Sequence, residues 1–170
     1  MAKKNGLSLG ETVRFGMLGA LMFALQVVMA PLPNIEPVSL LTMLFAVTFG
    51  WKSLYCIYTF VIMEVLFHGI GLWNINYFYI WTVLAVAAIF LRKMEPVLGW
   101  ALLSGVFGLA FGALCGIVDI FIGGFGYAAA KWVSGIPFDL LHCAGNFAIA
   151  LVLWKPLHQL LQKLKNRMTH

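Results

Sequence analysis

The stretch WVSGIPFDLLHCAGN, residues 132–146, places three polar side chains inside an apolar part of the chain. Asp139, His142 and Asn146 are separated by three and then four residues, so on a helix they share one face. The Gly-Ile-Pro of this stretch predicts a loop that enters the helix at its first turn. Because an ionisable group is costly in lipid, the polar face should point at protein or at a water-filled cavity. We interpret it as a wall of a ligand site, the alternative being hydrogen bonds that only hold helices together.

Composition sets the class of protein. The chain has 170 residues, of which 62% are hydrophobic and only 10% are charged. A bilayer-spanning helix needs about 20 apolar residues, so we predict an all-α polytopic membrane protein with six helices in one compact bundle, as a single domain over residues 1–170. No cleavable signal peptide is expected. The predicted spans are residues 11–29, 38–50, 54–67, 78–91, 97–122 and 137–154, followed by a basic amphipathic tail at 155–170.

The basic residues are sorted by these spans. Ten of the eleven Lys and Arg residues fall on one side, and only Lys131 falls on the other. Under the positive-inside rule both termini are then cytoplasmic. The loops predicted at 31–37, 69–77 and 123–131 lie outside, where their polar and aromatic residues converge on an outward-facing pocket. The candidate ligand-binding residues are Asn34, Glu36, Trp73, Asn74, Asn76, Lys131, Trp132, Asp139, His142 and Asn146.

Two stripes of small residues recur at a spacing of four, which lets another helix approach closely. The stripe in the fifth span predicts a close crossing inside the bundle. The stripe in the first span fits either docking of a partner helix or packing within the domain, and the pattern alone does not choose between them. The fifth-span stripe is Ser104, Gly108, Gly112 and Gly116, and the first-span stripe is Gly16, Ala20 and Ala24.

Enzymatic and metal-binding alternatives have weaker signals. Glu64 and His68 share a helix face and should be hydrogen-bonded; as half of a metal site they lack a second ligand cluster. Asp139 and His142 offer an acid/base pair for an intramembrane enzyme, but the chain has no GxSxG or HExxH motif. The absence of a Walker A motif means that ATP hydrolysis would have to come from a partner. The three cysteines show no CxxC spacing, and we expect neither cofactor nor metal. A purely structural role, in which the polar residues only pack, is a further alternative.

Span count, topology and the first-span stripe together resemble the substrate-binding S components of energy-coupling factor (ECF) transporters, over nearly the whole chain. The resemblance implies that Gly16, Ala20 and Ala24 dock on the coupling helices of a T component, with Gly where the family's motif begins with Ala. It also implies that the loop at 31–37 closes the ligand site. The expected location is a bacterial cell membrane, and the expected partners are the T component and two ATPase subunits, with no nucleic acid.

The ligand is less constrained than the family. The strings LPNIEPV (32–38), WNINY (73–77) and GIPFD (135–139) are similar to a group linked with cobalamin-type corrinoids, and they lack the patterns of the biotin, riboflavin and thiamine members. The implied function is capture of a vitamin at the outer face, followed by rotation in the membrane and release inside. Pantothenate, folate, and a pyrimidine or queuosine precursor are alternative ligands.

Overall fold

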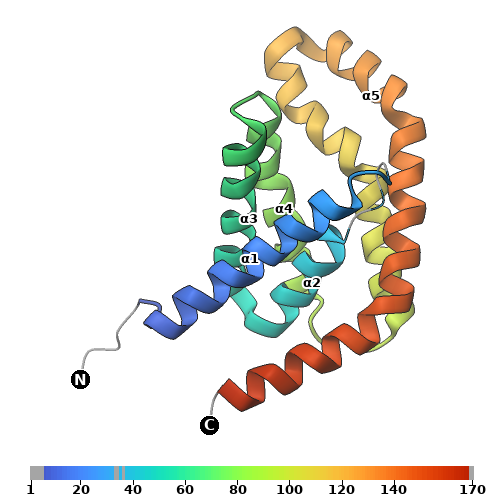
Figure 1. The fold of residues 1–170 in the computed structure, drawn as a ribbon. Coiled ribbons are helices and arrows are strands. Elements are labelled where there is room, and N and C mark those ends of the chain that lie inside the picture. The colour runs from blue at the N-terminus through green and yellow to red at the C-terminus, as the bar shows by residue number, and fades with distance from the viewer. Residues whose placement is uncertain (1–5, 33–34, 36, 169–170) are drawn as a thin grey trace.

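The computed structural model describes residues 6–32, 35 and 37–168, and every element in this part of the chain is helical (Figure 1). Four helical stretches are long and apolar enough to cross a membrane, α2 and α3 counting as one. The all-α class is therefore confirmed, whereas the six spans and the side on which the termini lie stay predictions. The elements are α1 (Leu9–Met29), α2 (Val38–Phe49), the 3₁₀ turn η1 (Gly50–Lys52), α3 (Ser53–His68), α4 (Trp73–Phe90) and α5 (Val97–Met168).

Local signals fix several of the helix ends. Ser8 and Glu11 form a capping box at the start of α1: the Ser8 hydroxyl accepts from the Glu11 N–H at 3.2 Å, and the Glu11 carboxylate accepts from the Ser8 N–H at 3.0 Å. Gly69 ends α3 with φ of 85°, a conformation that L side chains rarely adopt. The tight turn that follows α2 is the 3₁₀ turn η1.

Helix α2 forms the centre of the molecule. It is only 12 residues long, and ten of them are buried. It packs against α1, α3, α4 and α5. A helix that is covered on all sides exposes no face to solvent. The buried side chains of Ser39 and Thr42 therefore contact only other groups of the protein.

Helix α5 runs for 72 residues and leaves helical geometry only at Gly124, where φ is 78° and ψ is 176°. There the chain bends back on itself (Figure 1). We call residues 97–123 the ascending arm and residues 125–168 the returning arm. The ascending arm packs beside α4, and the returning arm passes α2 and ends in the tail.

Two predicted loops, at 123–131 and at the Gly-Ile-Pro of residues 135–137, are wrong, and the loop predicted at 69–77 is shorter than expected. The segment at 123–131 is helical apart from Gly124, and the helix passes through Pro137 instead of starting there. Helix α4 already begins at Trp73, so the loop predicted at 69–77 is only four residues long, 69–72, and Trp73 belongs to the helix. The physical reason is that an apolar environment offers no water to free backbone groups, which favours continuing the helix through residues that would break it in solvent.

The cations gather at one end of the molecule. The Lys52 ammonium lies 2.5 Å from the Glu11 carboxylate, which joins η1 to the start of α1. The Lys165 ammonium donates to the Thr48 carbonyl at 2.6 Å, which joins the tail to the end of α2. The loop between α4 and α5 adjoins the same tail. We call this the cationic end; the start of the returning arm, the segment that carries Lys131, lies at the opposite end of that arm (Figure 1).

Candidate functional site

The polar face of the returning arm packs directly on the glycine stripe of the ascending arm. The Gly112 N–H donates to Asp139 Oδ1 at 3.0 Å. A Cβ added at Gly108 would lie 2.8 Å from the His142 carbonyl oxygen, and one added at Gly112 would collide with the Asp139 carboxylate. The predicted close crossing is therefore confirmed at these two glycines. Gly116, the last member of the stripe, has nothing within 4 Å of an added Cβ.

Asn146 ties the returning arm to the central helix. Its Nδ2 donates to Ser39 Oγ at 2.9 Å and lies 3.4 Å from the Ser104 carbonyl oxygen. The residue is 1% exposed, and its Oδ1 has no hydrogen-bond partner among the described residues. Buried polar atoms are nearly always paired, so this oxygen offers an unused acceptor inside the bundle. Ser39 was not predicted, because nothing in its local sequence points across 107 residues.

An aromatic line connects His142 to the start of α4. The buried His142 ring meets Phe111 at a centroid distance of 5.0 Å, and Phe111 meets Trp81 at 5.8 Å. Trp81 then meets Tyr77 at 5.6 Å, and Tyr77 meets Trp73 at 5.1 Å. The tilted and edge-to-face geometries are those that aromatic quadrupoles prefer. The sequence could have indicated the α4 members of this line, because Trp73, Tyr77 and Trp81 recur at a spacing of four and so share one helix face.

The two asparagines at the start of α4 are both buried, at 5% and 8% exposure. Asn74 Oδ1 accepts from the Gly71 N–H at 2.5 Å, while its Nδ2 has no hydrogen-bond partner within the described residues. Asn76 Oδ1 lies 3.2 Å from the Tyr79 hydroxyl, which also contacts the Leu114 carbonyl of the ascending arm. The Tyr79 hydroxyl therefore links α4 to α5 and also contacts Asn76, whereas the Asn74 side-chain amide has no acceptor among the described residues.

Glu64 and His68 extend the aromatic line to α3. As predicted, they interact, with His68 Nδ1 3.1 Å from Glu64 Oε2. The other carboxylate oxygen, Oε1, is buried and has no hydrogen-bond partner in the described part of the chain. The His68 ring lies 6.3 Å from that of Trp73. Across the described residues, no three His, Cys, Asp or Glu side chains are grouped so as to hold a metal ion.

Lys131 is paired with an acid that the sequence prediction did not include in the site. Its ammonium lies 2.6 Å from Asp119 Oδ1; the Asp119 side chain is 5% exposed and that of Lys131 is 53% exposed. The same ammonium lies 5.9 Å from the centroid of the Tyr127 ring. The neighbouring Trp132 is 43% exposed.

Asn34 and Glu36, the candidate residues of the Pro-rich loop, lie outside the described residues. The remaining candidates occupy the returning arm and the start of α4. The structure brings Asp139, His142 and Asn146 together, and it connects His142 to Trp73 through aromatic rings. Together they offer amide, carboxylate and imidazole groups beside flat apolar surfaces, which is the composition of a small-molecule site.

The first-span stripe is only partly covered within the described chain, with Gly16 and Ala20 half-buried. The face of α1 that is buried consists of Phe15, Gly19 and Met22. Gly19 makes the close approach, since an added Cβ would lie 2.5 Å from the Cys56 carbonyl oxygen of α3. By contrast, Gly16 has nothing within 4 Å of an added Cβ, and Ala24 is exposed.

No family model, curated protein or solved structure matches this chain.

Proposed function

We propose that this chain is the substrate-capturing S component of an ECF-type importer, which binds a vitamin or related micronutrient at its outer face. The observation that carries the proposal is the polar face of Asp139, His142 and Asn146, joined by aromatic rings to Trp73 and lying away from the cationic end. Buried hydrogen-bonding atoms near this line, Asn146 Oδ1 and Asn74 Nδ2, have no partners among the described residues. A ligand that carries both donors and acceptors would pair them.

The character of the site favours a corrinoid over the alternative ligands. A corrinoid presents a large ring system edged with amides, which suits asparagine side chains and flat aromatic walls. Pantothenate or folate would bring carboxylates to an end of the molecule where Lys131 is already paired with Asp119. A pyrimidine or queuosine precursor fits the amides but leaves most of the aromatic line unused.

Energy would come from partner subunits, so the proposal assigns no catalytic step to this chain. The stripe of Gly16, Ala20 and Ala24 supports docking, because α1 packs inside the chain through a different face. Small residues on an outward face let a partner helix approach to backbone distance. The proposed partners are a T component and two ATPases, and the proposed orientation places the cationic end in the cytoplasm.

The test is ligand retention by the full-length protein purified in detergent. Cyanocobalamin, pantothenate, folate and queuine are each added, separated from unbound ligand and quantified by mass spectrometry, alongside any molecule that co-purifies. We expect cyanocobalamin to be retained, and Asn146→Ala to weaken its binding by about five- to thirtyfold, since one lost buried hydrogen bond is worth about 1–2 kcal/mol. The matched control Gln159→Ala, an exposed residue at the cationic end, should bind as the parent does. Retention of no compound, by protein that is folded, would refute the function.

A further inference from the structure

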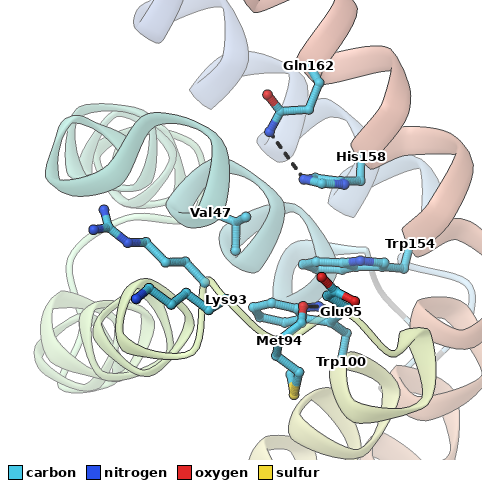
Figure 2. A pocket seen from close by; sticks show the side chains of 9 residues that line it. Val47, Lys93, Met94, Glu95, Trp100, Trp154, His158 and Gln162 are labelled. Carbon is cyan, nitrogen blue, oxygen red and sulfur yellow. Dashed lines mark hydrogen bonds between the residues drawn. The ribbon is translucent and has the colours of Figure 1, made fainter.

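A separate cavity lies at the cationic end, and the proposed vitamin site uses none of its residues (Figure 2). Its volume is about 770 Å³, and it is bounded by the loop that follows α4 and by the C-terminal part of the returning arm. A smaller cavity of about 290 Å³ adjoins it, with Glu95, Trp154 and His158 shared between the two. A space of this size at the end of a bundle can hold a group larger than a few water molecules.

One wall of the cavity is a column of stacked rings. Trp100 and Trp154 stack with centroids 4.1 Å apart and planes 13° apart, and both are almost completely buried. His158 stacks on the opposite face of Trp154 at 5.7 Å (Figure 2). The Trp100 indole N–H donates to the Met94 carbonyl at 3.0 Å, which fixes the loop against the column. This wall is therefore flat, apolar and held in place.

The rim of the cavities is polar and carries excess positive charge. Arg92 and Lys93 line the larger cavity and Lys155 lines the smaller one, against the single carboxylate of Glu95. Three cations and one anion leave a formal excess of two positive charges. In Figure 2 the Lys93 side chain extends away from the tryptophan pair.

The tail beside the cavity has the pattern of a helix that lies at a membrane interface. Leu161 is buried against the bundle, while Leu160 and Leu164 are 51% and 44% exposed. The exposed Lys163 follows on the same segment, and such alternation of exposed leucines with cations is typical of helices at the headgroup level. The bond from Lys165 to Thr48 holds this segment on α2. The cavity therefore opens where phospholipid headgroups would be.

We propose that this cavity binds the phosphate of an anionic phospholipid. Arg92 and Lys93 neutralise the phosphate, for which a guanidinium offers paired donors, and the Trp–His column packs against the glycerol part. Basic pockets between helices near an anionic leaflet are a known means of holding such headgroups. The proposal concerns residues and a ligand other than those of the vitamin site, so either can fail without the other.

The experiment is native mass spectrometry of the full-length protein, titrated in detergent with dioleoylphosphatidylglycerol in the absence of any vitamin. Dioleoylphosphatidylcholine serves as the zwitterionic control lipid. We expect the parent to prefer phosphatidylglycerol, and Arg92→Gln/Lys93→Gln to weaken this binding by about tenfold or more, since a cation near the anionic surface contributes about 1 kcal/mol. The matched control Lys163→Gln/Arg167→Gln removes the same charge from exposed residues that line neither cavity, and it should bind nearly as the parent does.

Three results would overturn the proposal. Equal losses in the two double variants would mean that the protein senses only overall charge. Equal binding of the two lipids, both of which carry a phosphate, would mean that the cavity does not select a phospholipid with net negative charge. Displacement of the lipid by inorganic phosphate or glycerol 1-phosphate at submillimolar concentration would show a site for a soluble phosphate instead of a lipid. Thermal melting of every variant shows that a loss of binding is not a loss of folding.

Discussion

At the scale of single residues, the glycines of the ascending arm differ sharply in what surrounds them. An added Cβ at Gly108 would meet backbone atoms of His142 and Cys143 at 2.8 to 2.9 Å, whereas Gly116 faces open space. Backbone atoms cannot move aside as a flexible side chain can, so the arms would have to separate. The stripe is therefore evenly spaced in the sequence, but its glycines differ in whether they make a close helix contact.

The first prediction follows from this difference. Gly108→Ala should destabilise the protein by about 1–3 kcal/mol, as overpacking of a close contact does. Gly116→Ala should leave stability unchanged or raise it slightly, because Ala is the better helix former. Thermal melting in detergent compares them, and equal melting temperatures for the two variants would contradict the packing described here.

The hydrogen bond between Ser39 and Asn146 gives the second prediction. A double-mutant cycle with Ser39→Ala and Asn146→Ala should show a coupling energy of about 0.6–1.7 kcal/mol, the range of side-chain hydrogen bonds between membrane helices. The measurement is reversible unfolding in mixed micelles. Additive single-variant effects would mean that the two side chains do not bond. Pairing Asn146→Ala with Thr12→Ala, on the exposed start of α1, is the additive reference.

The third prediction concerns the ion pair of Lys131 and Asp119. Lys131→Met leaves the Asp119 carboxylate, which is 5% exposed, without its cation. Breaking a fully buried ion pair costs about 3–5 kcal/mol. We expect a smaller loss of stability here because the Lys131 side chain is half exposed. Replacing both, with Lys131→Met and Asp119→Asn, should restore much of the melting temperature. The pair of Lys52 and Glu11 at the surface is the comparison: Lys52→Met should have little effect.

At the scale of helices, the sequence predicted the bounds of α1, α2 and α3 well but not the start of α4 or the course of α5. Apolar runs predicted α1, α2 and α3 to within a few residues, because periodicity and length report burial directly. The prediction failed at Pro137. Proline is typical of the first turn of a helix, but α5 continues through Pro137.

Part of the candidate site could be predicted from the spacing of its residues in the sequence. Spacing shows which residues share a face, so Asp139, His142 and Asn146 could be grouped from sequence. Spacing does not show what that face meets, so the match between this face and the glycine stripe of the other arm emerged only in three dimensions. Phe111 and Ser39 escaped prediction because their roles depend on distant segments.

The fourth prediction separates the true break in α5 from the apparent ones. Gly124→Ala should destabilise by about 1–3 kcal/mol, because φ of 78° with ψ of 176° is open essentially only to glycine. Gly126→Ala, at a helical position with nothing within 4 Å of an added Cβ, is the matched control and should be neutral or stabilising. Circular dichroism with thermal melting checks both. A neutral Gly124→Ala would mean that the arm bends elsewhere.

At the scale of the whole molecule, the separation of charge from the polar site defines an axis. Contacts place Lys52, Lys165 and the Arg92 loop at one end, and the α3–α4 loop lies at the other (Figure 1). In a membrane with an anionic inner leaflet, the positive-inside rule orients such a molecule in one direction.

The fifth prediction tests that orientation. In intact cells, Ile70→Cys should react with an impermeant maleimide, whereas Lys93→Cys should react only after permeabilisation. Both positions are exposed and lie in the loops at opposite ends. The parent chain, whose three cysteines are buried or half-buried, provides the background. The reverse pattern would invert the molecule and with it the proposed direction of uptake.

The bond from Ser39 to Asn146 also bears on how the protein is made. The ribosome makes α2 long before it makes the returning arm, and 107 residues of synthesis separate the two partners. Until that arm emerges, the hydroxyl of Ser39 lacks the partner that it has in the folded protein. The interior of the protein is therefore completed only after the returning arm has been made, and a chain that terminates before residue 146 leaves Ser39 without this bond.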